Sequence, residues 1–185
     1  NLGTALTTGT DNVAIGEASL DAVTTGSDNT AVGDNAGGAL TTGGNNVAIG
    51  SGALLVATTA SDNTAVGTLA LTANSSGTNN TAVGYAAGDA ITTANNTTVI
   101  GDNAGGAITT GSGNIAIGPD SLLGTTTQAN NTAVGLDALK ANTAADNTAV
   151  GSGALTANTT GTNNTAVGFA ALDANTTASN NTAFG

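Results

Sequence analysis

Apolar and polar residues repeat along this chain with a period of 17 positions. The recurring unit is a pentapeptide, most often Asn-Thr-Ala-Val-Gly or Asn-Val-Ala-Ile-Gly, and eleven copies are present. In ten of the eleven copies two β-branched or apolar residues flank an Ala, with Val99 the exception, so an extended chain would project the outer two side chains to one face and the central one to the other. The pattern therefore predicts a short β-strand in every copy, with the Ala facing inward.

The closing glycines of the copies stand 17 residues apart, except that 16 residues separate Gly135 from Gly151, which places a deletion near Ala144. The copies fill residues 1–185 without a linker. We expect a single repeat array and, because both ends stop inside a repeat, a segment of a longer fibre.

A unit this short cannot bury an apolar face alone, so neighbouring units must stack. Paired helices are excluded by the density of Gly, Asn and Thr. We predict an all-β fold, a parallel β-solenoid of eleven coils of 17 residues, one of them 16, with about two short strands in each coil. The repeat Gly would take positive φ at the turn.

The residues between the pentapeptides indicate what fills the interior. Most coils carry one large aliphatic residue four positions after the repeat Gly. Where that position is Gly instead, the large residue stands three positions later, as in Gly37 with Leu40 and Gly88 with Ile91; Gly3 and Gly105 follow the same rule. One fixed volume is thus filled from either of two places, and Ala lines the rest of a narrow interior.

The Asn that opens the pentapeptide is present in ten of eleven copies, and Thr97 is the exception. Stacked coils would place these residues in a column about 4.8 Å apart, where amides can hydrogen-bond along the rod. We interpret the column as a structural ladder and not as a ligand site. We call it the Asn ladder: Asn12, Asn29, Asn46, Asn63, Asn80, Asn114, Asn131, Asn147, Asn164 and Asn181.

The residue before the repeat Gly is apolar in every copy. If the neighbouring Ala faces inward, this residue faces outward, and the column forms an apolar stripe larger than monomers normally expose. The stripe predicts a homo-oligomer, either a trimer or an end-to-end filament. We call it the association stripe: Ile15, Val32, Ile49, Val66, Val83, Ile100, Ile117, Val134, Val150, Val167 and Phe184.

Composition narrows the function classes. Ala, Thr, Gly and Asn account for 125 of 185 residues, and the chain has no Cys, no His and a single basic residue. With no His, Cys or Arg, the usual acid/base and thiol groups are missing apart from 12 carboxylates, so we expect no enzyme, no catalytic residue and no cofactor. A net charge of -11 argues against binding of nucleic acid, and no apolar run is long enough for insertion of this segment into a membrane.

Two alternatives remain open. Asp11, Asp28, Asp62 and Asp146 each precede the repeat Asn, and such oxygen ligands could make a calcium-stabilised β-roll. Asn or Gly fills the same column in the other copies, which favours a turn. Regular Thr columns on a flat face would also suit an ice-binding β-solenoid, although Thr is the residue expected on an exposed strand face.

Residues 12–16, 46–50 and 114–118 resemble the repeats of the YadA-like heads of trimeric autotransporter adhesins, and residues 80–85 and 164–169 are similar to repeats of phage tail-fibre-like and bacterial surface-fibre proteins. The resemblance implies a left-handed parallel β-roll and three chains packed about a common axis through the association stripe. It also implies a structural or adhesive role in an extracellular, cell-surface or virion fibre, with a surface or glycan receptor as candidate partner. The single Lys140, which offers trypsin-like proteases one cleavage site, suits such exposure.

Overall fold

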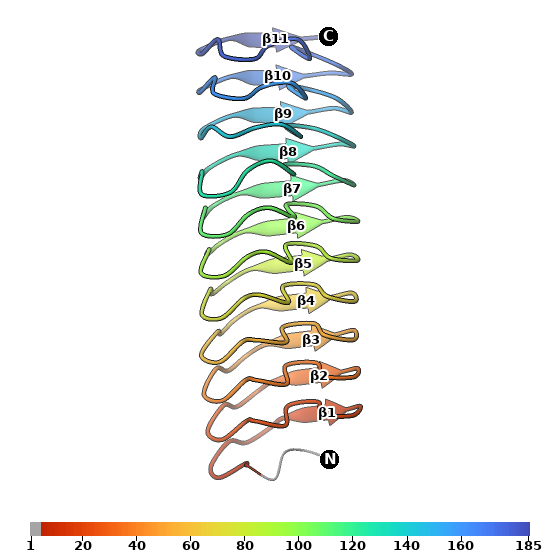
Figure 1. Cartoon of the computed structure of the whole chain (residues 1–185), viewed down its shortest axis with the longest axis vertical. Helices are drawn as coiled ribbons and strands as arrows, with labels where there is room; N and C mark the ends of the chain where they lie inside the picture. Colours follow the sequence, from red (N-terminus) through yellow and green to blue (C-terminus); the bar gives the residue numbers. More distant parts are fainter. Residues whose placement is uncertain (1–4) are drawn as a thin grey trace.

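A computed structural model describes residues 5–185 as one stack of coils that climbs from the N-terminus to the C-terminus (Figure 1). Every coil contributes one strand of three residues, at the triplet that the repeat predicts. The strands are β1 (Val13–Ile15), β2 (Thr30–Val32), β3 (Val47–Ile49), β4 (Thr64–Val66), β5 (Thr81–Val83), β6 (Thr98–Ile100), β7 (Ile115–Ile117), β8 (Thr132–Val134), β9 (Thr148–Val150), β10 (Thr165–Val167) and β11 (Thr182–Phe184).

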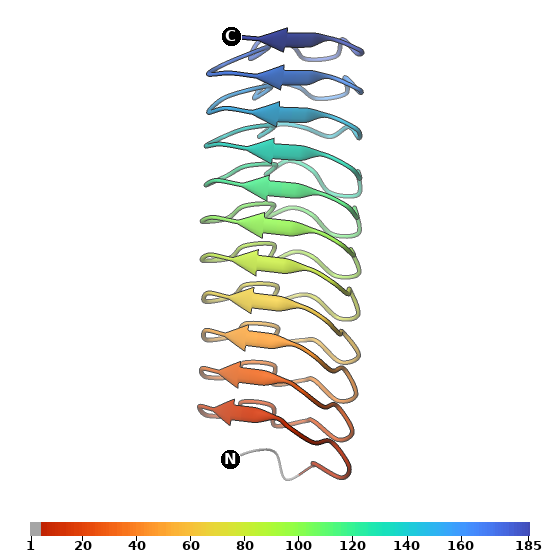
Figure 2. The same cartoon turned by 180° about the vertical axis from the view of Figure 1, so that it is seen from behind.

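The eleven strands form a single parallel sheet in sequence order. Between β2 and β3, for example, Ala31 pairs with Ala48 and Val32 with Ile49, so equivalent residues of successive coils lie above one another. The predicted parallel β-solenoid is confirmed. The strands stay nearly parallel along the whole stack (Figure 2), which is unusual for a large sheet and is typical of sheets held by side-chain ladders.

The coil is left-handed, as the resemblance implied. In Figure 2 the strands lie at the front and run from right to left while the chain climbs from N to C. Connections between parallel strands are usually right-handed. Here each connection contains several residues with left-handed backbone conformation, such as Asn35, Gly37 and Asn45 with φ of 55°, 58° and 59°.

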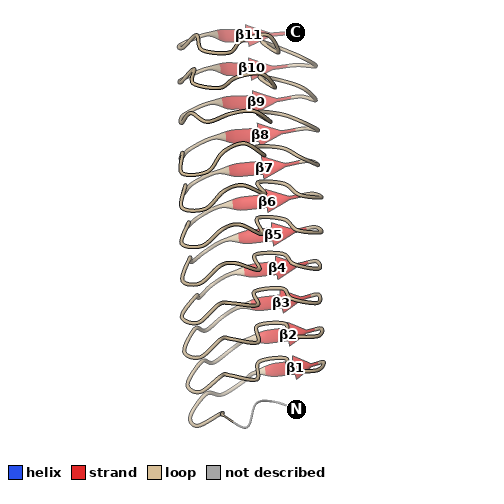
Figure 3. Cartoon of the chain, viewed as in Figure 1, coloured by secondary structure: helices blue, strands red, loops and turns tan. Residues whose placement is uncertain are grey.

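The expectation of about two short strands per coil was wrong, because each coil has one strand and the return half is a series of turns (Figure 3). The cause is local. The residues two and four positions after the repeat Gly have positive φ, even where the second of them is a leucine, such as Leu54 at 51°. The chain bends at both positions, and hydrogen bonds between residues three apart in the sequence, such as Leu40 N–H to Gly37 O (3.0 Å), close the turns.

The large aliphatic residues fill one column of the interior from both sequence positions. A Cβ added to Gly37 would lie 3.0 Å from Leu20 Cδ2, so the coil that lacks a leucine at that position is filled by its neighbours and by Leu40. Gly3 lies outside the described residues. The buried members are Leu20, Leu40, Leu54, Leu71, Ile91, Ile108, Leu122, Leu139 and Leu155.

Val99 stands where every other copy has Ala, and its neighbours explain the exception. It lies beside two adjacent coils that both have Gly at the interior position, Gly88 and Gly105. A Cβ on Gly88 would meet Val99 Cγ2 at 3.0 Å, and one on Gly105 would meet Val99 Cγ1 at 2.7 Å. The larger side chain thus occupies volume that the two glycines leave open.

The repeat Gly is required for two separate reasons. Gly135 has a φ of 130°, which only glycine adopts readily. In addition, a Cβ at this position would lie 2.6 Å from the carbonyl carbon of Gly151 in the next coil. Coils can therefore stack at strand spacing only if this turn carries no side chain.

The 16-residue coil keeps the sheet in register. Thr132 of β8 pairs with Thr148 of β9, so the deletion is absorbed outside the strands. Asn142 stabilises the shortened turn, since its Nδ2 donates to Ala144 O at 2.6 Å. The deletion predicted near Ala144 lies in this turn.

Candidate functional site

The structure brings the Asn ladder into one buried column at the start of the strands. Asn29 is typical: its Oδ1 accepts hydrogen bonds from the backbone N–H and from Nδ2 of Asn46, both at 3.0 Å. Its own Nδ2 donates to Gly43 O at 3.0 Å. Each amide thereby satisfies backbone groups of the next coil that would otherwise be buried without partners.

Thr97 interrupts this ladder. Its backbone N–H donates to Asn80 Oδ1 at 3.0 Å, as an Asn would, but its hydroxyl donates to Asn95 O within its own coil. Among residues 5–185, no acceptor is found for the backbone N–H of the next ladder member, Asn114. The ladder thus consists of two hydrogen-bonded runs that meet at this coil.

The association stripe lies on the outer surface of the sheet, which we call the sheet face. The middle residue of the strands is buried, whereas the first and last project outward. Between β2 and β10 the most exposed stripe members are Ile49 at 38%, Val83 at 37% and Val150 at 37%, and five of the nine members there are less exposed. The strand register sets each stripe residue against its equivalent in the next coil, so all eleven lie in one continuous column along the rod.

A second column on the sheet face runs parallel to the stripe and is formed by the first residue of each strand. Eight of its members are threonines, and we call these the Thr row: Thr30, Thr64, Thr81, Thr98, Thr132, Thr148, Thr165 and Thr182. Within residues 5–185, none of their hydroxyls takes part in a hydrogen bond. The sheet face thus carries one column with unbound hydroxyls on eight of its eleven strands and one column of apolar side chains, all Val or Ile except Phe184.

The threonines eight residues after the repeat Gly behave differently. Thr41 Oγ1 donates to the carbonyl of Thr58 in the next coil at 2.9 Å, and Thr159 Oγ1 donates to Thr176 O at the same distance. These hydroxyls hold coils together.

The Thr row differs from these threonines because its hydroxyls are unbound and lie on the sheet itself, although Val13, Val47 and Ile115 interrupt it. A second series of exposed hydroxyls, also unbound within the described residues, follows the turns nine positions after the repeat Gly, as at Thr42 and Thr93.

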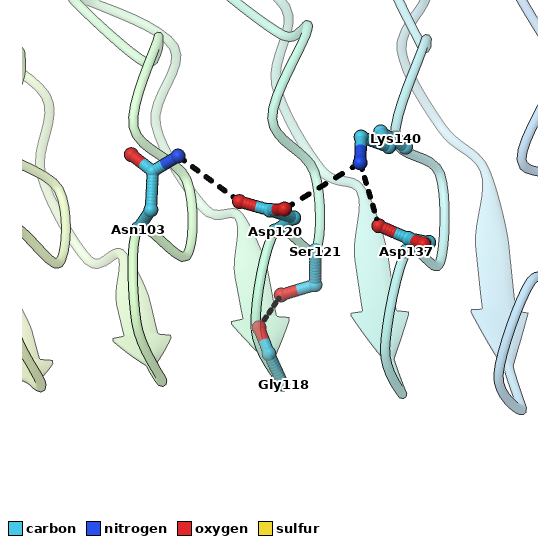
Figure 4. Close-up of polar contacts among 6 residues, drawn as sticks. All are labelled: Asn103, Gly118, Asp120, Ser121, Asp137 and Lys140. Atoms are coloured by element: carbon cyan, nitrogen blue, oxygen red, sulfur yellow. Dashed lines mark hydrogen bonds and ion pairs between the residues drawn. The ribbon is translucent and has the colours of Figure 1, made fainter.

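Charged side chains lie outside the sheet face, because no strand contains a charged residue. The most developed charged cluster joins three successive coils on the turn side (Figure 4). Lys140 Nζ lies 2.8 Å from Asp137 and 3.4 Å from Asp120, and Asn103 Nδ2 donates to Asp120 at 3.0 Å. The hydrogen bond to Asp137 raises the pKa of Lys140, so the lysine stays charged and links its own coil to that of Asp120.

The four acids that suggested calcium occupy one turn column with left-handed backbone. Asp11, Asp28, Asp62 and Asp146 have φ between 58° and 61°, and in other coils Asn or Gly takes the same conformation. Asp, Asn and Gly are the residues that tolerate it. Within residues 5–185 no three acidic side chains gather into a group that could hold a metal ion.

A second group of buried amides was missed at the sequence level. Asn74, Asn142 and Asn158 are completely buried seven positions after the repeat Gly, in the column that elsewhere holds Leu40 or Ile91. Asn158 Nδ2 bonds Asn142 Oδ1 at 2.8 Å and Gly161 O at 2.9 Å. The available signal was the mixture of Asn or Thr with large aliphatic residues in one column.

No protein-family model, curated protein or solved structure matches this chain. The described part of the chain, residues 5–185, also contains no helix able to cross a membrane and opens no pocket. The sheet face is therefore the candidate functional surface, because it combines regularity, exposure and lack of internal partners.

Proposed function

We propose that this chain is a structural segment of an extracellular fibre that self-associates through the association stripe. The observation that carries the proposal is the unbroken column of partly exposed apolar side chains along an eleven-stranded sheet. Monomeric proteins rarely leave a contiguous apolar strip of this length in water.

The distribution of charge supports a second copy of the chain as the partner. Two copies that each carry a net charge of -11 repel each other in most orientations. The sheet face is the surface on which neither copy presents a charged residue. Close approach is therefore least unfavourable where the apolar column is also available.

The internal bonding suits a load-bearing rod. Backbone hydrogen bonds link each coil to the next, as in Gly50 N–H to Val32 O at 2.8 Å, and the Asn ladder adds a bonded column parallel to them. Bonds that run along the axis resist separation of the coils. An exposed position outside a cell remains a proposal that rests on the single basic residue and on the repeat resemblance.

Substitution on the stripe tests the proposal. Val83→Lys places a charge in the middle of the sheet face, and Thr93→Lys places the same charge on an exposed turn, so the second variant is the matched control. Sedimentation velocity should show oligomers for the unmodified chain and for Thr93→Lys, and monomers for Val83→Lys. A monomeric unmodified chain at high concentration would refute the proposal.

The Thr row supports a second candidate, binding to ice. Its hydroxyls are unbound and repeat at strand spacing, about 4.8 Å, on a nearly flat sheet. Thermal hysteresis in dilute solution is the test, and Thr81→Lys should abolish it. Thr93→Lys changes the exposed turn hydroxyls instead and should leave the hysteresis intact; loss of hysteresis in Thr93→Lys alone would assign ice binding to the turns and not to the sheet face. Because ice and a second copy would compete for the same face, hysteresis should decline as the chain associates.

A further inference from the structure

The two columns of the sheet face differ in chemistry, and that difference restricts how two copies can meet. The Thr row lies where the strands begin and the association stripe lies where they end. A two-fold axis along the rod gives parallel rods and sets the stripe of one copy against the Thr row of the other. A two-fold axis across the rod, along the strands, gives antiparallel rods and sets stripe against stripe.

We infer that two copies of this chain associate face to face with their rods antiparallel. This inference rests on the proposed self-association through the stripe. In the fully overlapped antiparallel pair the two stripes are buried against each other, and five of the eight Thr-row hydroxyls meet another hydroxyl that can donate or accept: Thr30 with Thr165, Thr64 with Thr132, and Thr98 with its own copy. The other three threonines face the Val or Ile that interrupts the row. In the parallel pair the hydroxyls would be buried against methyl groups without partners, which is unfavourable.

Charges along the edges of the sheet favour the same orientation. With the two rods fully overlapped, β2 faces β10 and β6 faces itself, so each aspartate before a strand comes opposite an uncharged residue. One like-charged pair remains, between the two copies of Asp102 near the axis. The four facing pairs are Asp11 with Asn180, Asp28 with Asn163, Asp62 with Asn130, and Asp146 with Asn45.

The parallel pair places like charges together. A two-fold axis along the rod brings the column before the strand opposite the column after the repeat Gly of the same coil. Asp11 then faces Glu17, and Asp28 faces Asp34, and all four side chains are exposed. Like charges at such contacts oppose association and select against this orientation.

The area of the face is sufficient for a stable pair. Five residues from the ladder Asn to the repeat Gly span about 16 Å, and eleven strands span about 50 Å, which gives about 800 Å² for each copy. Stable interfaces commonly bury about 800 Å² on each partner. Two flat sheets can bury this area completely, whereas three flat faces around a three-fold axis cannot.

The absence of cysteine from the chain allows a direct test. Val32→Cys and Val167→Cys lie on β2 and β10, which face each other only in the antiparallel pair. The two variants are mixed, one of them isotopically labelled, and treated with a bismaleimide that spans about 10 Å, the usual separation of packed sheets. We expect mixed dimers in the mixture and little cross-linking of either variant alone.

Two further variants distinguish a wrong orientation of the rods from an absence of self-association. Ile100→Cys on β6 should cross-link to itself, and Thr93→Cys on the exposed turn should not. Cross-linking of Val32→Cys to itself would show parallel rods and overturn the orientation while self-association stands. Sedimentation as a monomer, with no cross-linking of Ile100→Cys, would overturn both the orientation and the proposed function.

Discussion

At the scale of single residues, stability depends on whether each buried amide finds its partner in the next coil. Asn63 shows the complete arrangement. Its Oδ1 accepts the N–H of Asn80 at 3.0 Å, while its Nδ2 donates to Gly77 O at 2.9 Å. Leaving a buried group of this kind unpaired costs about 1–3 kcal/mol. One interrupted position in the ladder should therefore change the free energy of unfolding by a measurable amount.

Replacement of Thr97 by Asn should repair the ladder. The new Oδ1 would accept the N–H of Asn114, which has no acceptor among the described residues, and the side chains are similar in size. We expect the free energy of unfolding to rise by about 1 kcal/mol, as measured by urea denaturation. Thr98→Asn is the matched control, because that side chain faces outward; it should give no gain. Equal gains in both variants would contradict this account of the ladder.

Asp89 provides a pH-dependent test. Partial burial raises the pKa of its carboxyl, so the folded state binds the proton more tightly than the unfolded state does. The charged carboxylate therefore destabilises the fold above the raised pKa, and this penalty disappears as the pH falls below the ordinary pKa of Asp.

Asp89→Asn should accordingly raise the melting temperature at neutral pH, and the difference from the unmodified chain should vanish in acid. The gain should stay under about 1 kcal/mol, because the carboxyl is still largely in contact with water. Asp21→Asn removes the same charge from the equivalent, exposed position of another coil and serves as control. A pH-independent gain in Asp89→Asn would disprove the burial argument.

At the scale of one coil, a single volume is filled from two alternative positions. Leu40→Ala alone should lower the free energy of unfolding by about 2–5 kcal/mol because it leaves a cavity. Gly37→Leu alone should be unfavourable by about 1–3 kcal/mol through overpacking, since a Cβ there already lies 3.0 Å from Leu20 Cδ2.

The double variant Gly37→Leu with Leu40→Ala should recover most of this loss, because it reproduces the pattern of Leu54 with Ala57 in the next coil. A double-mutant cycle from urea denaturation measures the coupling. Additive losses would mean that the two positions do not share one volume.

The repeat made the strands predictable, but the conformation of the return half of each coil could not be predicted from it. β-Branched residues around an Ala mark the strands, and the Asp/Asn/Gly column was recognisable as a turn because few other residues tolerate positive φ. The bend at Leu54 was not predictable from propensity, since leucine does not favour that conformation. Packing of the side chain into the interior imposes it, and the expected second strand is lost as a result.

The candidate site also has one feature that the sequence predicts and one that only the structure shows. The outward direction of the association stripe follows from the alternation within the triplet. The distinction between free and bound threonines could not be read from the sequence, because Thr41 and Thr81 both occur in columns that are mostly Thr. Only the stacked coils show that the first hydroxyl donates to a carbonyl of the next coil and that the second does not.

At the scale of the whole molecule, the acidic turns oppose self-association, whereas the uncharged sheet face favours it. The net charge of -11 lies along the edges and turns of the rod, so two copies that meet face to face also bring their acidic edges together. Repulsion between exposed charges decays over about 10 Å at 0.1 M salt and over about 30 Å at 0.01 M. Salt should therefore control association without any specific ion site.

We expect the dissociation constant of the self-associated form to fall about tenfold or more when the salt concentration rises from about 0.01 M to about 0.1 M. A tenfold change is equivalent to about 1.4 kcal/mol. Sedimentation equilibrium in NaCl measures it, and Val83→Lys, which carries a charge on the sheet face, should remain monomeric in both. A CaCl₂ series matched in ionic strength separates screening from specific binding. Equal association in both salts supports screening by mobile ions; association that needs calcium and is reversed by a chelator would instead assign the acidic turns a role as metal ligands between copies.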